Sequence, residues 1–321
     1  MSLSTVETTD FDQLEPFRRE LTGYCYRMLA SPFDAEDAVQ ETFLRAWRGR
    51  SRFEDRMGLR PWLYRIATNV CFDMLKGRSR RALPAEVAPV ATGQFVMGSP
   101  RPEATWIAPI SDEFVASPDP DPGEVAIGRE SIRLAFIAAL QHLAPRQRAV
   151  LILRDVLRWQ ASEVAEFLET TETSVNSMLR RARSAIAGAD LDAIPASPPE
   201  VEHALLAGYV DAFQRYDVDA LVDLLHEDVL VAMPPFELWL QGVADARTFL
   251  ASMDDGGHDR VIPVRANGQP AVAVWRPDSA TGRLEAYALM VLEVADEKIA
   301  SIHAFLDPAI FAAFGLSTTA D

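Results

Sequence analysis

The spacing of apolar residues predicts two amphipathic helices in the first 80 residues. The stretch at 31–50 carries apolar residues at intervals of three to four, which places them on one face of a helix. These residues are Ala35, Val39, Phe43 and Trp47, with Ala38 and Leu44 beside them. The stretch at 60–81 repeats this spacing on Trp62, Ile66, Ala67 and Val70, and Pro61 suits its first turn. The pattern predicts an all-helical first domain.

The polar faces of these two helices differ in charge. The first is acidic, and on charge alone it fits a solvated surface near a helix N-terminus. It carries Asp34, Glu36, Asp37, Gln40 and Glu41. The second face carries Arg65, Asn69, Asp73 and Lys76, and Arg78, Arg80 and Arg81 follow it. Arginines interleaved with aromatic rings suit a nucleic-acid backbone and unpaired bases, although an ordinary basic amphipathic helix has the same pattern.

Residues 130–186 predict a helix-turn-helix. Two short helices end this block, and Val164, Ala165 and Leu168 of the first would pack against Val175 and Leu179 of the second. Thr171 can cap the second helix. Its remaining polar residues suit groove edges and phosphates, and they are Ser174, Asn176, Ser177, Arg180, Arg181 and Arg183. This pattern has many false positives, so alone it indicates DNA binding without the class of regulator.

The last 120 residues predict a different architecture. Residues 198–233 read as two helices running into a strand, and 243–253 read as a further helix. Period-two segments follow at 271–275, 284–294 and 298–305, with a hairpin turn at 295–298. Helices followed by a curved antiparallel sheet predict a cone-shaped α+β domain.

Two breaks divide the chain. Residues 83–123 are rich in proline and glycine, and 189–200 form a second break. We therefore expect domains at 11–82, 124–188 and 200–317, with a linker at 83–123. Within this linker, Trp106, Ile110 and Phe114 are four residues apart, and we expect them to dock on the protein itself or on a partner.

Charge changes the picture once it is divided along the chain. The whole chain of 321 residues has a formal net charge of -16. Residues 11–82 nevertheless carry 14 Lys and Arg against 10 Asp and Glu, and residues 124–187 carry 9 against 7. Residues 188–321 carry 7 against 22. The two helical blocks can therefore present basic faces to nucleic acid, while the last third is acidic.

Several classes of protein are not indicated. No apolar run approaches the ~20 residues of a membrane span, and the first ten residues lack the features of a signal peptide, so we expect a cytoplasmic protein without a membrane partner. Cys25 and Cys71 are far apart and lack nearby ligands, which argues against a zinc site or a disulfide. We expect no metal and no cofactor.

The order of these segments resembles a known family. DAEDAVQETFLRAWR, RPWLYRIATNVCFDMLK, an acidic linker and LAPRQRAVLILRDVLRWQASEVAEFL followed by SVNSMLRRAR look like the body of a bacterial extracytoplasmic-function sigma factor. The resemblance implies a region-two domain at 11–82, which binds core RNA polymerase and the minus-ten promoter element. It also implies a region-four domain at 124–188, which reads the minus-thirty-five element.

The resemblance implies roles for individual residues. The clamp of the polymerase largest subunit would be bound through Asp37, Gln40, Glu41 and Leu44, while the region-four domain would contact the polymerase flap. The minus-ten element would be melted and read through Phe53, Arg65, Asn69, Asp73, Lys76 and Arg78. The minus-thirty-five element would be read through Thr171, Ser174, Asn176, Ser177, Arg180, Arg181 and Arg183.

The helix-turn-helix departs from the usual pattern of this family. Glu169 stands in the turn where many members have glycine, and Asn176 and Met178 stand where many have basic residues. Fewer phosphate contacts would result, so we expect lower nonspecific DNA affinity and a weaker dependence on salt.

The last third resembles SnoaL-like domains, which a subgroup of these sigma factors carries. The subgroup's SVNS and NGQPA segments are similar to 174–177 and 267–271 here. In relatives of this fold the cone encloses an apolar pocket, and the residues we expect to line it are Tyr209, Phe213, Met233, Trp239, Trp275, His303 and Asp307. His303 and Asp307 could form an acid-base pair, but a histidine in a strand is more often a core residue, so we expect no catalytic residues.

The combined expectation is a sigma factor whose acidic C-terminal domain docks on the rest of the chain and regulates it. We expect this domain to shade or orient the basic DNA-binding faces, in place of a separate anti-sigma protein. Such a protein is not an enzyme. Two alternatives remain at this point: a helix-turn-helix regulator that acts without polymerase, and a DNA-binding module fused to a small-molecule-binding or cyclase-like domain.

Overall fold

Three helices form the first bundle of the computed structural model, which describes residues 13–50, 58–93, 95–115, 128, 130–187, 197–252 and 259–320. After the short turn η2 (Glu15–Phe17) come α1 (Arg18–Leu29), α2 (Pro32–Gly49) and α3 (Leu59–Leu75). The Ser31 hydroxyl caps α2 by accepting a hydrogen bond from the Asp34 N–H at 3.3 Å. Tyr24, Phe43 and Leu63 lie fully buried between the three helices. The predicted all-helical first block is confirmed.

The second bundle contains the predicted helix-turn-helix. It comprises α5 (Leu134–Gln141), α6 (Pro145–Leu151), the π-helical turn η8 (Ile152–Val156), α7 (Ala161–Phe167) and α8 (Glu172–Ile186). Thr171 caps α8 as expected, since its hydroxyl accepts from the Ser174 N–H at 3.2 Å. Val164 and Val175 are fully buried where α7 and α8 cross.

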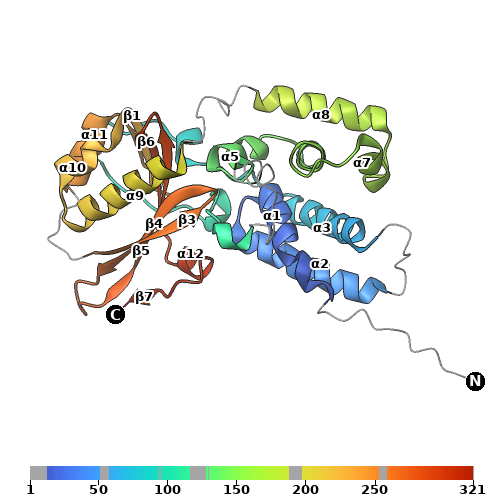
Figure 1. Cartoon of the computed structure of the whole chain (residues 1–321), viewed down its shortest axis with the longest axis horizontal. Helices are drawn as coiled ribbons and strands as arrows, with labels where there is room; N and C mark the ends of the chain where they lie inside the picture. Colours follow the sequence, from blue (N-terminus) through green and yellow to red (C-terminus); the bar gives the residue numbers. More distant parts are fainter. Residues whose placement is uncertain are drawn as a thin grey trace, which may run out of the picture.

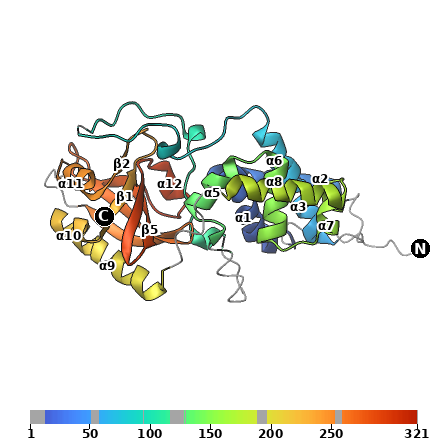
Figure 2. The same cartoon turned by 90° about the horizontal axis from the view of Figure 1, so that it is seen from above.

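The linker between the bundles follows a long path over the rest of the molecule. Figure 2 shows it, in teal, running out over the C-terminal domain and back. Its short turns are η5 (Pro84–Glu86), η6 (Glu103–Thr105) and η7 (Asp112–Phe114). Trp106 forms a parallel bridge with Ala82 and is buried, as is Ile110. The expected docking of this segment is confirmed for these two residues, whereas Phe114 is 45% exposed.

The C-terminal domain combines four helices with one mixed sheet. The helices are α9 (Pro199–Gln214), α10 (Val218–Asp223), α11 (Val243–Ser252) and α12 (Ala309–Ala312). The strands are β1 (Leu225–Ala232), β2 (Trp239–Gln241), β3 (Arg260–Ala266), β4 (Gln269–Pro277), β5 (Leu284–Ala295), β6 (Lys298–Phe305) and β7 (Thr319–Ala320). Their order is β2-β1-β6-β5-β4-β3, and β7 pairs with β5. The predicted α+β class is confirmed.

The sequence predicted an antiparallel sheet, and the observed sheet is mixed, which corrects that prediction. β1 pairs with β6 in parallel, while the other strand pairs are antiparallel. β1 enters the sheet from α10 rather than from a hairpin with β6, so no tight turn forces the two strands to run in opposite directions.

The two faces of this sheet have different neighbours. Successive residues of a strand point to opposite faces. Ile302 and Ala304 of β6 point to the face covered by α9 and α11, where they border a cavity. Phe305 points to the other face, where it joins an apolar core shared with the two helical bundles. Figure 1 shows the C-terminal domain against one end of the bundles and α8 at the far side of the molecule.

Candidate polymerase, promoter and regulatory surfaces

The polar face of α2 is open in this structure. Asp37 and Gln40 are exposed, Glu41 is half-buried, and Leu44 is 42% exposed. The face is partly ordered by side-chain contacts along the helix: Gln40 Nε2 donates to Glu36 Oε1 at 3.1 Å, and Arg45 Nε donates to Glu41 Oε1 at 2.7 Å. An exposed leucine among carboxylates gives this face the mixed character of a protein interface.

Trp47 is not part of the buried stripe of α2, which corrects the sequence prediction. The buried apolar positions run through Val39, Phe43 and Ala46, and Trp47 lies about 100° further around the helix from Ala46. Its ring is 43% exposed and carries the Arg50 guanidinium 4.2 Å above its centre. Trp47 therefore extends the exposed apolar surface that begins at Leu44.

The face of α3 that was predicted to read the minus-ten element lies opposite the helix-turn-helix. Arg65 forms an ion pair with Glu169, in the turn between α7 and α8. A hollow of about 290 Å³ lies between the two elements, and Asn69 and Phe167 are among its walls. Tyr64 of α3 also contacts Trp159, with ring centres 5.4 Å apart. Residue 53, which was predicted for the same face, lies outside the described residues.

The other charged residues predicted for the minus-ten face have acidic or basic partners within their own bundle. Lys76 Nζ lies 2.7 Å from Asp73, and Arg78 Nη1 lies 2.8 Å from Asp34. Lys76 is the main cause of a lowered pKa of Asp73, and Arg45 contributes. Asn69, Asp73, Lys76 and Arg78 are all exposed. Outside the hollow, the predicted minus-ten face is therefore accessible to solvent, and most of its charged side chains are paired with a side chain of opposite charge.

The predicted minus-thirty-five face of α8 is exposed along its length. Thr171, Asn176, Arg180, Arg181 and Arg183 are exposed, and Ser174 and Ser177 are half-buried. Arg183 is held by Asp155 through contacts of 2.9 and 2.7 Å. Among the described residues, neither Arg180 nor Arg181 makes an ion pair. Within the part of the chain that the structure describes, the acidic C-terminal domain does not cover this helix, so the expectation that the domain shades the basic faces is wrong for α8, while the alternative that it orients them stays a prediction.

The C-terminal domain instead joins the rest of the chain through Asn267, in the β3–β4 turn. This asparagine is fully buried and has a backbone φ of 56°. Its Nδ2 donates to the Tyr26 hydroxyl of α1 at 2.7 Å and to the Ile132 carbonyl, just before α5, at 2.6 Å. Its Oδ1 accepts from the Ile110 N–H at 3.0 Å, and its own N–H donates to the Ile110 carbonyl at 3.0 Å.

Groups around Asn267 extend this junction. The Tyr26 hydroxyl donates to the Ala108 carbonyl at 2.9 Å, which ties α1 to the linker. Asp112 of the linker accepts from the Gly268 N–H at 2.7 Å and from Arg265 Nε at 3.3 Å. One turn of the C-terminal sheet therefore contacts the first bundle, the linker and the second bundle together.

Buried arginines join the two bundles to each other. Arg27 of α1 donates to the Ser131 hydroxyl at 2.6 Å, and Arg148 of α6 donates to the Met28 carbonyl. Burial lowers the pKa of each guanidinium to about 10, so both remain protonated at neutral pH. Because both cations bond to carbonyl and hydroxyl oxygens, separating the bundles would leave several buried polar groups to find new partners.

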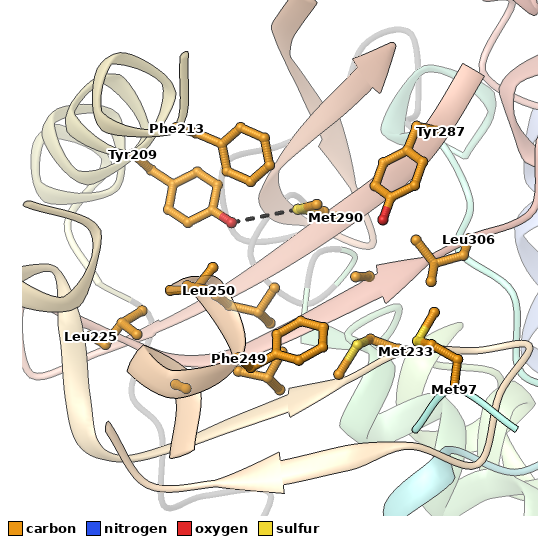
Figure 3. A pocket seen from close by; sticks show the side chains of 14 residues that line it. Met97, Tyr209, Phe213, Leu225, Met233, Phe249, Leu250, Tyr287, Met290 and Leu306 are labelled. Carbon is orange, nitrogen blue, oxygen red and sulfur yellow. Dashed lines mark hydrogen bonds between the residues drawn. The ribbon is translucent and has the colours of Figure 1, made fainter. Parts of the chain in front are cut away.

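The apolar cavity of the C-terminal domain has a different lining from the predicted one. Its walls are Met97, Tyr209, Phe213, Leu225, Val231, Met233, Ala246, Phe249, Leu250, Tyr287, Met290, Ile302, Ala304 and Leu306 (Figure 3). Of these, Tyr209, Phe213 and Met233 were predicted. Trp239 instead donates from its indole Nε1 to the Ala88 carbonyl of the linker at 2.9 Å.

The three other residues predicted for the cavity also lie elsewhere. Trp275 packs against Phe311 with ring centres 5.0 Å apart. His303 points to the opposite face from Ile302 and Ala304. Asp307 caps the turn into α12, where its Oδ1 accepts from the Ala309 N–H at 3.0 Å.

His303 and Asp307 do not form the acid-base pair considered from sequence. The His303 Nδ1 is buried and has no hydrogen-bond partner among the described residues. Burial lowers the pKa of His303 to about 4, so the ring is neutral at physiological pH. Among the residues that the structure describes, no group of three or more metal-ligating side chains occurs. None of the described helices is long and apolar enough to cross a bilayer.

Sequence reasoning missed the residues that join the domains. Asn267 belongs to a segment whose resemblance to relatives was visible, but neither its burial nor its partners follow from local pattern. Met97 and Phe95 of the linker were missed entirely. The one local signal was a run of three apolar residues in a proline-rich segment, and this run does not show that Phe95 and Met97 are half-buried while Val96 between them is exposed.

Comparisons with known proteins agree with this arrangement. Residues 14–81 match Sigma-70 region 2, residues 133–186 match Sigma-70 region 4, and residues 206–302 match the SnoaL-like domain. The chain is 44% identical over 314 residues to the ECF RNA polymerase sigma factor SigG of Mycobacterium tuberculosis, covering 94% of this chain and 82% of that protein.

A second relative shares the fold over almost the whole chain. The ECF RNA polymerase sigma factor SigJ of Mycobacterium tuberculosis is 28% identical over 220 residues, covering 68% of this chain and 63% of that protein. Its crystal structure matches with a TM-score of 0.63 at 21% identity, covering 95% of this chain and 99% of the SigJ chain.

Proposed function

The chain belongs to the extracytoplasmic-function RNA polymerase sigma factors, and from that premise we propose that its C-terminal domain holds it in a closed, inactive arrangement. In this proposal residues 11–82 and 124–188 bind the polymerase clamp and flap and read the minus-ten and minus-thirty-five elements. Residues 200–317 keep these two parts together until core polymerase or a signal separates them. Transcription takes place in the cytoplasm, where we place the protein.

The observation that carries the proposal is the set of partners of Asn267. This one side chain bonds to Tyr26 of the first bundle and to Ile132 at the entry of the second, and it also pairs with Ile110 of the linker. All four groups are in a buried junction, where an unmade hydrogen bond is costly. Movement of either bundle away from the C-terminal domain breaks at least one of these bonds.

The distance between the promoter elements supports the same conclusion. The two elements are centred about 25 base pairs apart, which is about 85 Å of duplex at 34–36 Å per helical turn. Here α3 touches the turn that precedes α8, through the ion pair between Arg65 and Glu169. The two reading surfaces must therefore separate before both elements can be bound, and the linker must leave its docked path.

We further propose that the C-terminal domain performs no bond chemistry. Its cavity is lined by apolar and phenolic side chains, and none of the residues lining it is a carboxylate or a histidine. General acid-base catalysis most often uses such a group beside the substrate, and burial raises the pKa of the Tyr209 hydroxyl, which makes it a poor base at neutral pH. The buried His303 lies on the opposite face of the sheet.

The substitution Asn267→Ala tests the closed arrangement. Loss of three side-chain hydrogen bonds in a buried junction costs about 1–3 kcal/mol, which shifts the balance toward the open form by roughly 5- to 100-fold. Run-off transcription with purified core polymerase on genomic fragments should therefore increase at limiting concentrations of the variant. Energy transfer between dyes at Arg48→Cys and Ser184→Cys should fall, because α2 and α8 move apart.

Asp296→Ala provides the matched control. Asp296 lies in the β5–β6 turn of the same sheet, has a φ of 48° and is exposed. It shares the left-handed backbone of Asn267 but none of its contacts to the bundles. The native thiols Cys25 and Cys71 are fully buried and should not take up dye. If Asn267→Ala matched Asp296→Ala in both measurements, the closed arrangement would not depend on the C-terminal domain.

A further inference from the structure

The cavity of the C-terminal domain is apolar and almost filled. It lies between α9, α11 and the inner face of the sheet, and its free volume is about 50 Å³. Small-molecule sites commonly measure about 300–1,000 Å³. The space is therefore too small for such a ligand as long as all of its walls remain in place.

One of these walls comes from the linker rather than from the domain itself. Met97 lines the cavity, and Phe95 packs edge-to-face on Phe249 of α11 with ring centres 5.8 Å apart. Val96, between them, is 76% exposed, so the linker presents alternate residues to the domain. Figure 3 shows Met97 beside Met233 at the edge of the cavity. We call residues 95–97 the plug.

The plug is held by contacts on both sides that a ligand could loosen. Before it, the Ala91 N–H donates to the Trp239 carbonyl at 2.9 Å. After it, the Arg101 N–H donates to the Pro235 carbonyl at 2.9 Å, and Arg101 pairs with Glu237. These contacts are few and lie at the surface of the domain, whereas a packed core element would have a continuous ladder of bonds.

The cavity contains a polar group that the protein does not fully use. Tyr209 is 2% exposed, and among the described residues its hydroxyl has one hydrogen-bond partner, the Met290 Sδ at 3.5 Å (Figure 3). A thioether sulfur is a weak acceptor, so a buried phenol would gain from an oxygen acceptor in the same place. Burial raises the pKa of this hydroxyl, which therefore remains a donor at neutral pH.

From these features we propose that the cavity binds an uncharged, mainly apolar small molecule with one acceptor oxygen, and that this ligand replaces the plug. The apolar walls exclude a charged ligand, because no described lining residue could compensate its charge. Tyr209 would donate to the acceptor oxygen in place of Met290. Met97 and Phe95 would leave, which frees the linker segment between the two DNA-binding bundles.

Displacement of the plug would reach the junction through the linker. Shortly after Arg101, Glu103 accepts from Arg81 at 3.0 Å. Trp106 is buried further along the linker, and Ile110 is buried and bonded to Asn267. This step, from ligand to opening, rests on the closed arrangement proposed above. The replacement of the plug by a ligand does not rest on the closed arrangement, because it concerns the cavity alone.

Nile red, an uncharged dye with a carbonyl oxygen, is a suitable probe for the purified full-length chain. We expect Phe95→Ala/Met97→Ala to bind the dye about tenfold more tightly than wild type, since the dye no longer displaces two half-buried apolar side chains. Val96→Ala, an exposed residue of the same plug, should bind as wild type does. Tyr209→Phe should bind about three- to tenfold more weakly, through loss of one hydrogen bond.

Amide hydrogen exchange provides a measurement that does not depend on dye fluorescence. Saturating Nile red should speed exchange at Ala91 and Arg101 both in the wild-type chain and in Asn267→Ala, because release of the plug concerns the cavity alone. Equal dye affinity in wild type and the double variant would overturn the exchange of plug for ligand. Equal affinity in Tyr209→Phe would overturn the role of the hydroxyl, and absence of saturable binding in all variants would overturn the site itself. None of these results depends on transcription, so each is separate from failure of the closed arrangement.

Discussion

The two helices predicted to read the promoter are in opposite situations. α3 faces the second bundle, where Arg65 is paired with Glu169 and Tyr64 contacts Trp159. α8 presents Arg180 and Arg181 to solvent, and among the described residues neither has an acidic partner. The closed arrangement therefore acts on the position of α3 relative to α8, and it leaves the surface of α8 uncovered.

This difference indicates how regulation in the same chain can work. Long-range attraction between an acidic domain and basic DNA-binding faces is weak at physiological salt, where the Debye length is about 8 Å. The acidic domain here is instead attached through the uncharged side chain of Asn267 and through apolar packing of residues such as Phe305. In the proposed closed arrangement, control depends on the spacing of the two promoter-reading surfaces, with little contribution from competition for phosphates.

The largest expected effect is on DNA binding by α8. Arg180→Ala/Arg181→Ala should remove two phosphate contacts, which lowers affinity for a duplex carrying the minus-thirty-five element by roughly 50-fold at 0.1 M salt. The slope of log affinity against log salt should become shallower by about 1.8. Fluorescence anisotropy of labelled duplex with the full-length chain measures both quantities.

Arg183→Ala is the matched control for this experiment, because Arg183 is already paired with Asp155 at 2.7 Å. Breaking a phosphate contact here is partly offset by releasing that pair, so the loss should be only a few-fold. A loss as large as that for Arg180→Ala measured alone would mean that the ion pair does not persist in solution, and that α8 has three equivalent cations.

The second largest expected effect is on the stability of the C-terminal domain, which in our proposal holds α3 against the second bundle. The pKa of His303 is about 4 in the folded chain, below its ordinary value of about 6.5. Between these values the unfolded chain takes up a proton that the folded chain does not, so stability falls as the pH is lowered. From pH 6.5 to 5 the free energy of unfolding should fall by about 1.6 kcal/mol on account of this residue.

Replacement of the histidine isolates its contribution. His303→Leu should remove this part of the pH dependence, measured by urea unfolding, whereas His203→Gln at an exposed position should retain it. In wild type, energy transfer between α2 and α8 should decrease over the same pH range, while duplex binding by α8 at fixed salt should change little. Identical pH profiles for wild type and His303→Leu would show that His303 is hydrated in the folded chain.

The sequence was sufficient to predict those features that depend on local pattern. Helical periodicity identified α2, α3 and the helix-turn-helix, and Thr171 was recognised as a cap because capping involves residues three positions apart. The error at Trp47 was small in angle: the stripe continues at Ala46, and the tryptophan lies beside it. The roles assigned to α2, α3 and α8 in binding polymerase and DNA stay predictions.

The sequence was less informative about the cavity and the junction. Strand alternation shows which residues share a face, but it does not show which face encloses a cavity. His303 was therefore assigned to the face that Ile302 and Ala304 occupy. The contacts of Asn267 with Tyr26 and Ile132 join residues 241 and 135 positions apart, and no local pattern records such pairs.

The smallest expected effect concerns the link between α3 and the helix-turn-helix itself. Glu169 stands where many relatives have glycine, and its φ of 51° is a conformation that costs a residue with a side chain about 1–2 kcal/mol. Its carboxylate is 75% exposed and pairs with Arg65, a contact worth at most about 1 kcal/mol. Backbone strain and the ion pair therefore act in opposite directions on the stability of the chain.

Two substitutions of Glu169 separate these contributions. Glu169→Gln removes only the charge, so energy transfer between α2 and α8 should fall slightly while stability to urea changes by less than about 1 kcal/mol. Glu169→Gly also relieves the backbone, so it should open the chain to the same extent but stabilise the second bundle by about 1 kcal/mol. Unchanged transfer in both variants would mean that α3 is held by the Tyr64 and Trp159 contact and the buried arginines, without help from this pair. Reduced transfer in both would identify Glu169 as a residue that this chain retains at a cost in backbone strain because it keeps the minus-ten face against the helix-turn-helix.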